Sequence, residues 1–164
     1  MTSILVPSPD LFLREDAIRG GMDLLFFANT RHLKRADEKL AELGLGRAHH
    51  RVLYFVQRKP GSPISGLQSI LAITKQSLKR VTHDLIERGL IELQQGRVDR
   101  RQRLVHLTDS GAALERQLFA ELHDNMAQAY AASGGDAVRG FWTVLQHLIG
   151  DEGRQQFSKV QSCK

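Results

Sequence analysis

Residues 62–89 read SPISGLQSILAITKQSLKRVTHDLIERG, a pattern that predicts two short helices joined by a tight turn. Ser62 can cap the first helix and Pro63 can occupy its first position, and apolar residues then follow at helical spacing as far as Leu71. Thr74 can cap a second helix, whose inward residues lie three and four apart before a terminating glycine: Leu78, Val81, Leu85 and Gly89. Two short helices separated by a three-residue turn are typical of a helix-turn-helix.

After this stretch the sequence changes from a helical to an alternating pattern. Residues 90–93 and 103–107 are candidate strands, and residues 96–102 connect them as a hairpin with a basic tip. A helix-turn-helix followed by such a hairpin is a winged helix-turn-helix. The predicted fold class is therefore mainly α with a small β-hairpin, the wing.

Long amphipathic helices are predicted on both sides of this unit, because apolar residues recur there at spacings of three and four. Gly20 and Gly21 can kink or fray the first of them, and Pro60 stops the second. Four such helices are expected, over residues 18–43, 48–58, 108–133 and 138–149. The outermost helices carry more apolar surface than a helix-turn-helix needs to bury, which indicates that they form a dimer interface.

The positive charge of the chain is concentrated in one segment. The formal net charge is +5, and from Lys75 to Arg103 eight Lys and Arg residues stand against four acids, whereas the last third of the chain is acidic. A basic excess on a predicted helix-turn-helix favours nucleic acid as the partner. Charge alone leaves open an ordinary solvated surface.

The second helix of the helix-turn-helix presents a polar outer face once its apolar residues are buried. Gln can pair with adenine edges, Lys and Arg with guanine edges or phosphates, and the helix N-terminus with a phosphate. The candidate major-groove residues are Thr74, Lys75, Gln76, Ser77, Lys79, Arg80 and His83.

The hairpin tip offers a second contact, because basic wings can place an arginine in the minor groove. The candidate residues there are Arg97, Asp99, Arg100 and Arg101. A carboxylate facing DNA would repel phosphate, so we expect Asp99 to orient a neighbouring arginine through a bidentate pair. An incidental surface charge is the alternative.

Four runs of the sequence together resemble the MarR family of bacterial winged-helix transcription regulators: LAITKQSLKRV (71–81), LIERGLI (85–91), DRR (99–101) and VHLTDSG (105–111). The match is continuous over about residues 50–115. The resemblance implies that residues 74–83 form the recognition helix, that Arg101 is the minor-groove arginine and that Asp99 is its partner. It also implies a two-fold dimer on a pseudo-palindromic operator in double-stranded DNA.

The resemblance has two departures and leaves several points open. Residues 96–98 read Gly-Arg-Val where family wings often have Asp-x-Arg, and Glu92-Leu93 stand where an arginine is common. Which wing arginine penetrates deepest is therefore open. The operator, the regulated genes and the choice between repression and activation are not encoded in the sequence, although family habit favours repression of neighbouring genes.

The chain is expected to be a single regulator domain over residues 1–164. Its winged helix-turn-helix DNA-binding lobe is predicted at residues 48–108. Its helical dimerisation lobe is predicted at residues 10–45 together with residues 109–160, and it joins two copies as a homodimer.

The resemblance further implies that a small effector can control DNA binding from a cavity between the two lobes. Four residues open the second predicted helix near that place and mark a weak candidate site for a small anionic or aromatic effector: Arg47, His49, His50 and Arg51. Redox-sensing members carry an early cysteine, whereas Cys163 is next to the end of this chain, and its role is open. A regulator without an effector is equally compatible with the sequence.

Other classes of protein find little support in the sequence. It has no phosphate-binding glycine loop, nucleophile elbow, zinc-protease helix or supported pair of acids, so we expect no enzyme and no cofactor. Its scattered histidines predict no metal site. Without a signal peptide or an 18-residue apolar run, the chain is expected to be soluble and cytoplasmic, with no membrane partner.

A winged-helix adaptor that binds another protein is the alternative function. Protein interfaces favour aromatic side chains and are poor in lysine. The outward positions of the predicted recognition helix are instead Lys, Gln, Ser and Arg. The sequence therefore favours sequence-specific DNA binding over the adaptor.

Overall fold

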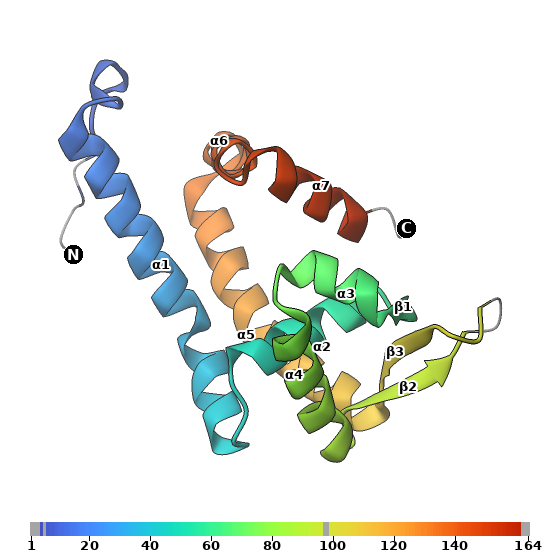
Figure 1. Cartoon of the computed structure of the whole chain (residues 1–164). Helices are drawn as coiled ribbons and strands as arrows, with labels where there is room; N and C mark the ends of the chain where they lie inside the picture. Colours follow the sequence, from blue (N-terminus) through green and yellow to red (C-terminus); the bar gives the residue numbers. More distant parts are fainter. Residues whose placement is uncertain (1–3, 5, 97–98, 162–164) are drawn as a thin grey trace.

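The computed structural model describes residues 4, 6–96 and 99–161, and these residues form seven α-helices, one short 3-10 helix and three strands (Figure 1). In chain order the elements are η1 (Pro9–Leu11), α1 (Glu15–Glu42), α2 (Arg47–Arg58), β1 (Ser62–Pro63), α3 (Ile64–Leu71), α4 (Lys75–Glu87), β2 (Ile91–Gln95), β3 (Arg103–Leu107), α5 (Asp109–Ser133), α6 (Gly135–Leu148) and α7 (Gly150–Gln161). The mainly α fold with a small sheet is confirmed.

The helix-turn-helix consists of α3, a three-residue turn and α4. Ala72 begins the turn in the left-handed conformation, with φ of 51°. Thr74 caps α4 as predicted, since its Oγ1 accepts a hydrogen bond from the backbone N–H of Ser77 at 3.1 Å. Gly89, with φ of 65°, follows α4 in the left-handed conformation that L-residues with a Cβ disfavour. The cap by Thr74 and the left-handed Gly89 were both predicted from the sequence.

The sheet has one strand more than the predicted hairpin. Its order is β1-β3-β2, and both pairings are antiparallel. Ser62 and Pro63 form β1 and pair with Val105 and Leu104, so the prediction that Ser62 caps α3 from outside and that Pro63 is its first residue is wrong. The Ser62 hydroxyl instead donates to the carbonyl of Lys59 at 2.8 Å. Proline is tolerated there because β1 is a short edge strand.

The hydrophobic core lies where the C-terminal part of α1 meets α2, α3, α4, the sheet and the N-terminal part of α5. Its largest fully buried side chains are Leu40, Leu53, Leu67, Leu71, Leu78, Leu85, Ile91 and Leu118. Gly111 brings α5 against the start of the wing, because a Cβ at this position would lie 1.8 Å from the carbonyl oxygen of Leu90. The same hydrophobic core therefore positions both α4 and the wing.

The long helix α1 continues through Gly20 and Gly21, so the expected kink is not present. Its N-terminal half projects away from the helix-turn-helix, as the blue helix of Figure 1 shows. All residues from Ile18 to Arg31 on this part of α1 are exposed. Among the described helices, none is both long and apolar enough to cross a membrane.

The C-terminal region forms two helices where only one was predicted. Gly150, with φ of 63°, separates α6 from α7. α7 returns to pack against α3, where Val160 is buried and Nζ of Lys159 donates to Oγ of Ser69 at 3.0 Å. α7 was not predicted because its sequence, GDEGRQQFSKVQ, is mostly polar.

Candidate nucleic-acid interface

The outer face of α4 is polar from Lys75 to His83. Leu78, Val81 and Leu85 are buried, and Thr82 turns inward, with its hydroxyl donating to the carbonyl of Leu78 at 2.8 Å. This packing leaves all seven predicted residues of the helix exposed: Thr74, Lys75, Gln76, Ser77, Lys79, Arg80 and His83. The structure thus brings the whole predicted set to one surface.

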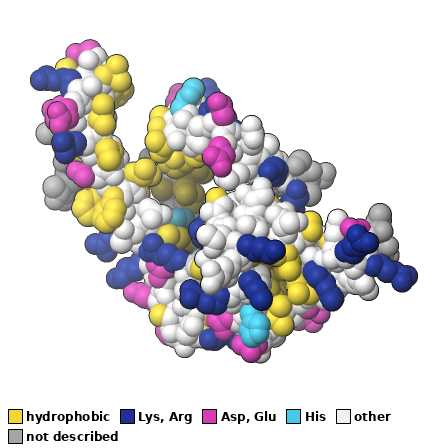
Figure 2. Space-filling view, viewed as in Figure 1, with side chains coloured by type: hydrophobic (Ala, Val, Ile, Leu, Met, Phe, Trp, Pro, Cys, Tyr) yellow, Lys and Arg dark blue, Asp and Glu magenta, His cyan; other side chains and the backbone are white. Residues whose placement is uncertain are grey.

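The cations of α4 and the wing are not neutralised by the protein. Six of them form no ion pair with any acid in the described part of the chain: Lys75, Lys79, Arg80, Arg100, Arg101 and Arg103. Elsewhere, by contrast, Arg47 and Arg88 are paired with Asp37 and Asp84. Figure 2 shows dark-blue side chains over the surface where Figure 1 places α4 and the wing. This surface attracts a polyanion.

The wing, formed by β2, β3 and their connection, projects beside α4 (Figure 1). Asp99, Arg100 and Arg101 are exposed in its turn, while the predicted Arg97 lies outside the described residues. Gly96 allows the turn to close, because a Cβ there would lie 2.5 Å from the carbonyl oxygen of Asp99. The wing therefore presents two described arginines at a tight tip.

The expected bidentate pair of Asp99 is not formed with Arg100 or Arg101. Oδ1 of Asp99 instead accepts the backbone N–H of Arg101 at 2.9 Å. An aspartate commonly accepts such a bond from a residue two positions later in a turn. Asp99 thus fixes the backbone that carries Arg101 rather than its guanidinium.

A polar network holds the C-terminal end of α4 to the loop between α1 and α2. Nε of Arg88 donates to Oδ1 of Asp84 at 2.7 Å, and Nη1 of Arg88 donates to the carbonyl of Leu43 at 2.7 Å. His49 contacts Asp84 from α2. The hydrogen bond from Arg88, its charge and the contact with His49 hold the pKa of the Asp84 carboxyl below its ordinary value. The orientation of α4 is therefore tied to α2.

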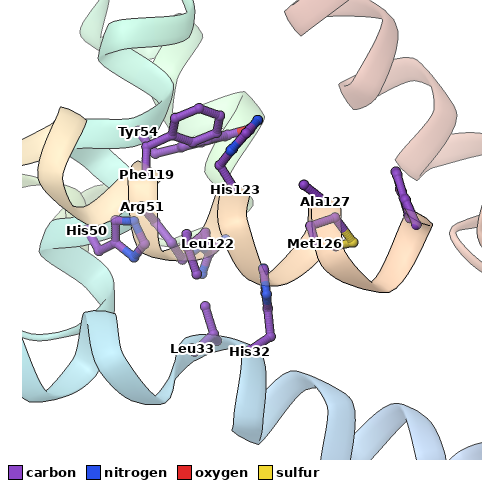
Figure 3. Close-up of a pocket in the computed structure, with 11 residues that line it drawn as sticks. His32, Leu33, His50, Arg51, Tyr54, Phe119, Leu122, His123, Met126 and Ala127 are labelled. Carbon is purple, nitrogen blue, oxygen red and sulfur yellow. The ribbon is translucent and has the colours of Figure 1, made fainter. Parts of the chain in front are cut away.

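A cavity of about 550 Å³ lies between α1, α2 and α5 (Figure 3). α1 contributes His32 and Leu33, and α2 contributes His50, Arg51 and Tyr54. α5 contributes the other lining residues: Phe119, Leu122, His123, Met126, Ala127 and Tyr130. The wall is mostly apolar, with polar groups at a few places, as in many small-molecule sites.

Two of the four predicted effector residues line this cavity. His50 and Arg51 do, whereas Arg47 is bonded to Asp37 at 2.6 Å and His49 lies 2.8 Å from Asp84. The contacts that Arg47 makes with Asp37 and His49 makes with Asp84 keep these two side chains out of the cavity. The lining residues of α5 were not among the predicted effector residues, although they recur in the sequence at intervals of three and four from Phe119 to Tyr130.

The polar atoms of the cavity are incompletely satisfied. His50 is only 7% exposed, and its Nε2 and the Nδ1 of His32 are buried without a hydrogen-bond partner in the described part of the chain. Burial lowers the pKa of His50, so its imidazole is neutral at neutral pH.

A large apolar surface remains uncovered on α1 and α6. On α1 it includes Ile18, Met22, Leu25, Phe26 and Phe27, and on α6 it includes Phe141, Trp142, Val144 and Leu148. Figure 2 shows these helices with yellow side chains on the sides that face each other across the upper part of the molecule. Apolar patches of this kind mark protein interfaces.

Comparisons with known proteins agree with the winged helix-turn-helix fold. The MarR family model matches residues 43–102. HTH-type transcriptional regulator PetP of Rhodobacter capsulatus is 40% identical over 154 residues, which are 94% of this chain and 93% of that protein. A crystal structure of a MarR family transcription regulator has a TM-score of 0.71 at 15% identity and covers 94% of this chain and 99% of its own. A mutant MarR from E. coli, complexed with operator DNA, has a TM-score of 0.63 at 23% identity, with coverage of 84% and 98%.

Proposed function

We infer that this chain, which belongs to the MarR family of winged helix-turn-helix transcription regulators, represses transcription as a homodimer bound to operator DNA. One observation carries the proposal: the cations of α4 and the wing are exposed and unpaired within the described residues. Surface cations without an acidic partner in the protein are available to bind phosphate. Their binding releases the counterions condensed on DNA, which favours the complex.

α4 is the element proposed to enter the major groove, whose width accepts an α-helix. Gln76 can make a bidentate contact with adenine, and Lys79 and Arg80 can reach guanine edges or phosphates. The N-terminus of α4, capped by Thr74, offers free amides to a backbone phosphate. Together these groups would both orient the protein and read bases.

The wing is proposed to follow the adjacent minor groove. At AT-rich sequences the minor groove is narrow and electronegative, and it attracts arginine. Arg100 and Arg101 are the described candidates. Arg97 remains part of the proposal from the sequence. Asp99 supports the contact indirectly, because it holds the backbone N–H of Arg101.

The exposed apolar side chains of α1 and α6 are proposed to form the two-fold dimer interface. The proposed dimerisation lobe consists of residues 10–45 and 109–160, and the DNA-binding lobe of residues 48–108. A two-fold dimer presents two copies of α4, so the operator would be pseudo-palindromic with half-sites about one helical turn apart, roughly 34–36 Å.

The cavity between α1, α2 and α5 is proposed to bind a small anionic or aromatic effector. Arg51 supports an anion, and Tyr54, Phe119 and Met126 support an apolar body. The cavity adjoins both proposed lobes, so its occupant can favour one relative orientation of them. The proposed activity is binding without catalysis, in the cytoplasm where the operator lies.

Fluorescence anisotropy tests the proposal directly. The purified protein is titrated with duplex from its own upstream intergenic region and with a scrambled duplex, over a series of salt concentrations. We expect selective binding, with the logarithm of the affinity falling by about 0.9 per neutralised phosphate for each logarithmic unit of salt. Equal binding to both duplexes, or salt-insensitive capture of a protein partner instead of DNA, would support the adaptor.

A further inference from the structure

Arg51 lies between the cavity and the turn of the helix-turn-helix. Its side chain lines the cavity from α2, as Figure 3 shows. Its Nη2 also donates a hydrogen bond of 2.7 Å to the carbonyl oxygen of Leu71. Leu71 is the last residue of α3, and Ala72 then begins the turn that leads into α4. One guanidinium therefore borders the cavity and holds the turn before the proposed recognition helix.

The bond to Leu71 adds a hydrogen bond at the end of α3, beside the core packing of Leu71 and Ile73. The last carbonyls of a helix have no partner within it. The N–H of Ala72 bonds to the carbonyl of Gln68, and Arg51 bonds to that of Leu71. Ala72 itself is held at φ of 51°, a conformation that costs an L-residue free energy. Loss of the Arg51 bond would therefore loosen the turn and the direction in which α4 leaves it.

Arg51 is also free to bind an anion. Arg47, one turn earlier on α2, is paired with Asp37, whereas Arg51 forms no ion pair within the described residues. A guanidinium has five N–H donors, and the bond to Leu71 uses one nitrogen. His50 lines the same cavity. Adjacent residues of α2 thus supply a cation and a neutral hydrogen-bonding group.

We propose that Arg51 is the positioning residue through which the cavity controls the proposed recognition helix. A carboxylate bound in the cavity recruits the Arg51 guanidinium, breaks its hydrogen bond to Leu71 and so lowers the affinity for DNA. A carboxylate competes well with a backbone carbonyl, because it carries the opposite charge and can accept two parallel bonds from the guanidinium. This inference rests on the proposed function, since it needs both the effector cavity and DNA binding through α4.

The linkage between the two sites is reciprocal. A ligand that binds more tightly when Arg51 has left Leu71 weakens DNA binding, and DNA weakens ligand binding by the same factor. Benzoate is a suitable probe because it joins one carboxylate to a small apolar ring, and benzamide is its neutral counterpart. Trp142 reports occupancy, because it is the single tryptophan of the chain and its Nε1 donates to the hydroxyl of Tyr130 at 3.0 Å, at the cavity wall.

The experiment measures two quantities for each full-length variant: benzoate affinity from Trp142 fluorescence, and DNA affinity from anisotropy with and without benzoate. For the wild type we expect benzoate to weaken DNA binding by about fivefold or more, the lower end of typical allosteric coupling. Benzamide should leave DNA affinity unchanged. Arg51→Ala should bind benzoate more weakly and show the same DNA affinity with and without it.

Arg51→Lys and Arg58→Ala complete the design. Lysine keeps the charge but lacks the planar fork, so we expect benzoate binding to recover in part while the effect on DNA stays smaller than in the wild type. Arg58 is on the same helix but outside this cavity, so Arg58→Ala removes an equal charge and should keep the wild-type response to benzoate. A merely structural Arg51 would change DNA affinity without changing either response to benzoate.

The contrary outcomes are distinguishable. If benzoate weakens DNA binding equally in wild type, Arg51→Ala and Arg51→Lys, the inference is overturned and the proposed function stands. If selective DNA binding is present but benzoate changes neither Trp142 fluorescence nor DNA affinity up to its solubility limit, the carboxylate assignment and this inference are both overturned. Absence of selective DNA binding by the wild type overturns the proposed function itself.

Discussion

Nε2 of His49, on α2, lies 2.8 Å from Oδ2 of Asp84, on α4. The same carboxylate accepts the Arg88 guanidinium, which in turn reaches the carbonyls of Leu43 and Gly44. The two helices and the loop before α2 are thereby joined by one acid. Since the next two residues after His49 line the cavity, α2 connects the cavity to α4 at both ends of the proposed recognition helix.

We expect Asp84→Asn to weaken operator binding while leaving the fold intact, because a neutral amide loses the charge that pairs with Arg88 and one of the two oxygens that contact Arg88 and His49. The loss of stability should be smaller than that of Leu85→Ala on the same helix, a core truncation worth about 2–5 kcal/mol. Anisotropy and urea unfolding measure the two effects. An Asp84→Asn protein with wild-type DNA affinity would show that the network does not position α4.

The carboxyl of Asp84 also predicts a pH dependence. Its pKa in the folded protein is below the ordinary value of 3.8, so between these two values the unfolded chain binds a proton that the folded chain does not. Stability from this group is therefore fully present above pH 3.8 and is lost as pH falls through the folded pKa. In acid unfolding experiments, the free energy of unfolding should fall less steeply with decreasing pH for Asp84→Asn than for the wild type.

Gly111 is predicted to be intolerant of any side chain. A Cβ there would lie 1.8 Å from the carbonyl oxygen of Leu90, so Gly111→Ala must displace α5 from the wing. We expect a loss of about 3 kcal/mol, the upper end for overpacked sites. Gly66→Ala is the matched control, because its Cβ would meet only Pro63 at an ordinary 3.5 Å. Equal stability of the two variants would contradict the close approach.

The buried imidazole of His50 predicts a second loss of stability on acidification, at higher pH than the loss that Asp84 causes. Burial lowers its folded pKa below the ordinary 6.5, so the unfolded chain gains a proton first as the solution is acidified. The free energy of unfolding should fall as pH decreases from 6.5 through that window. His50→Gln should flatten this part of the curve, and His147→Gln, at an exposed position of α6, should leave it unchanged. Superimposable curves for wild type and His50→Gln would refute the effect.

The proposed contacts in the major and minor grooves predict different consequences of single substitutions. Gln76→Ala should change base preference, at about 1–3 kcal/mol for a lost bidentate contact. Arg101→Ala should weaken binding most at sites with AT-rich flanks, where the minor groove is narrow. Selection from randomised duplexes followed by anisotropy measures both. Wild-type binding by both variants would remove the proposed interface.

Local signals were sufficient for the helix-turn-helix. The cap by Thr74 and the left-handed Gly89 depend on residues close in the chain, and both are present as expected. The exposed polar face of α4 followed from the spacing of its buried residues alone.

The features that the sequence did not reveal depend on distant partners. Ser62 reads as a helix cap until its pairing with Val105 is known. Asp99 reads as an arginine partner, but the turn of the wing brings it to a backbone N–H instead. The cavity forms where three helices pack together. The sequence around His32 and Tyr130 therefore does not show that these residues line the same cavity as His50.

The most direct test of the account compares two triple variants that lose the same charge at different places. Lys75, Lys79 and Arg80 are replaced by alanine in one, and Lys34, Arg35 and Arg139, which form exposed ion pairs away from α4, in the other. Anisotropy with the operator duplex measures both, with size-exclusion chromatography to verify the dimer. We predict that the first variant loses selective binding and the second keeps it. Equal weakening by both would show that net charge, and not the face of α4, carries DNA binding.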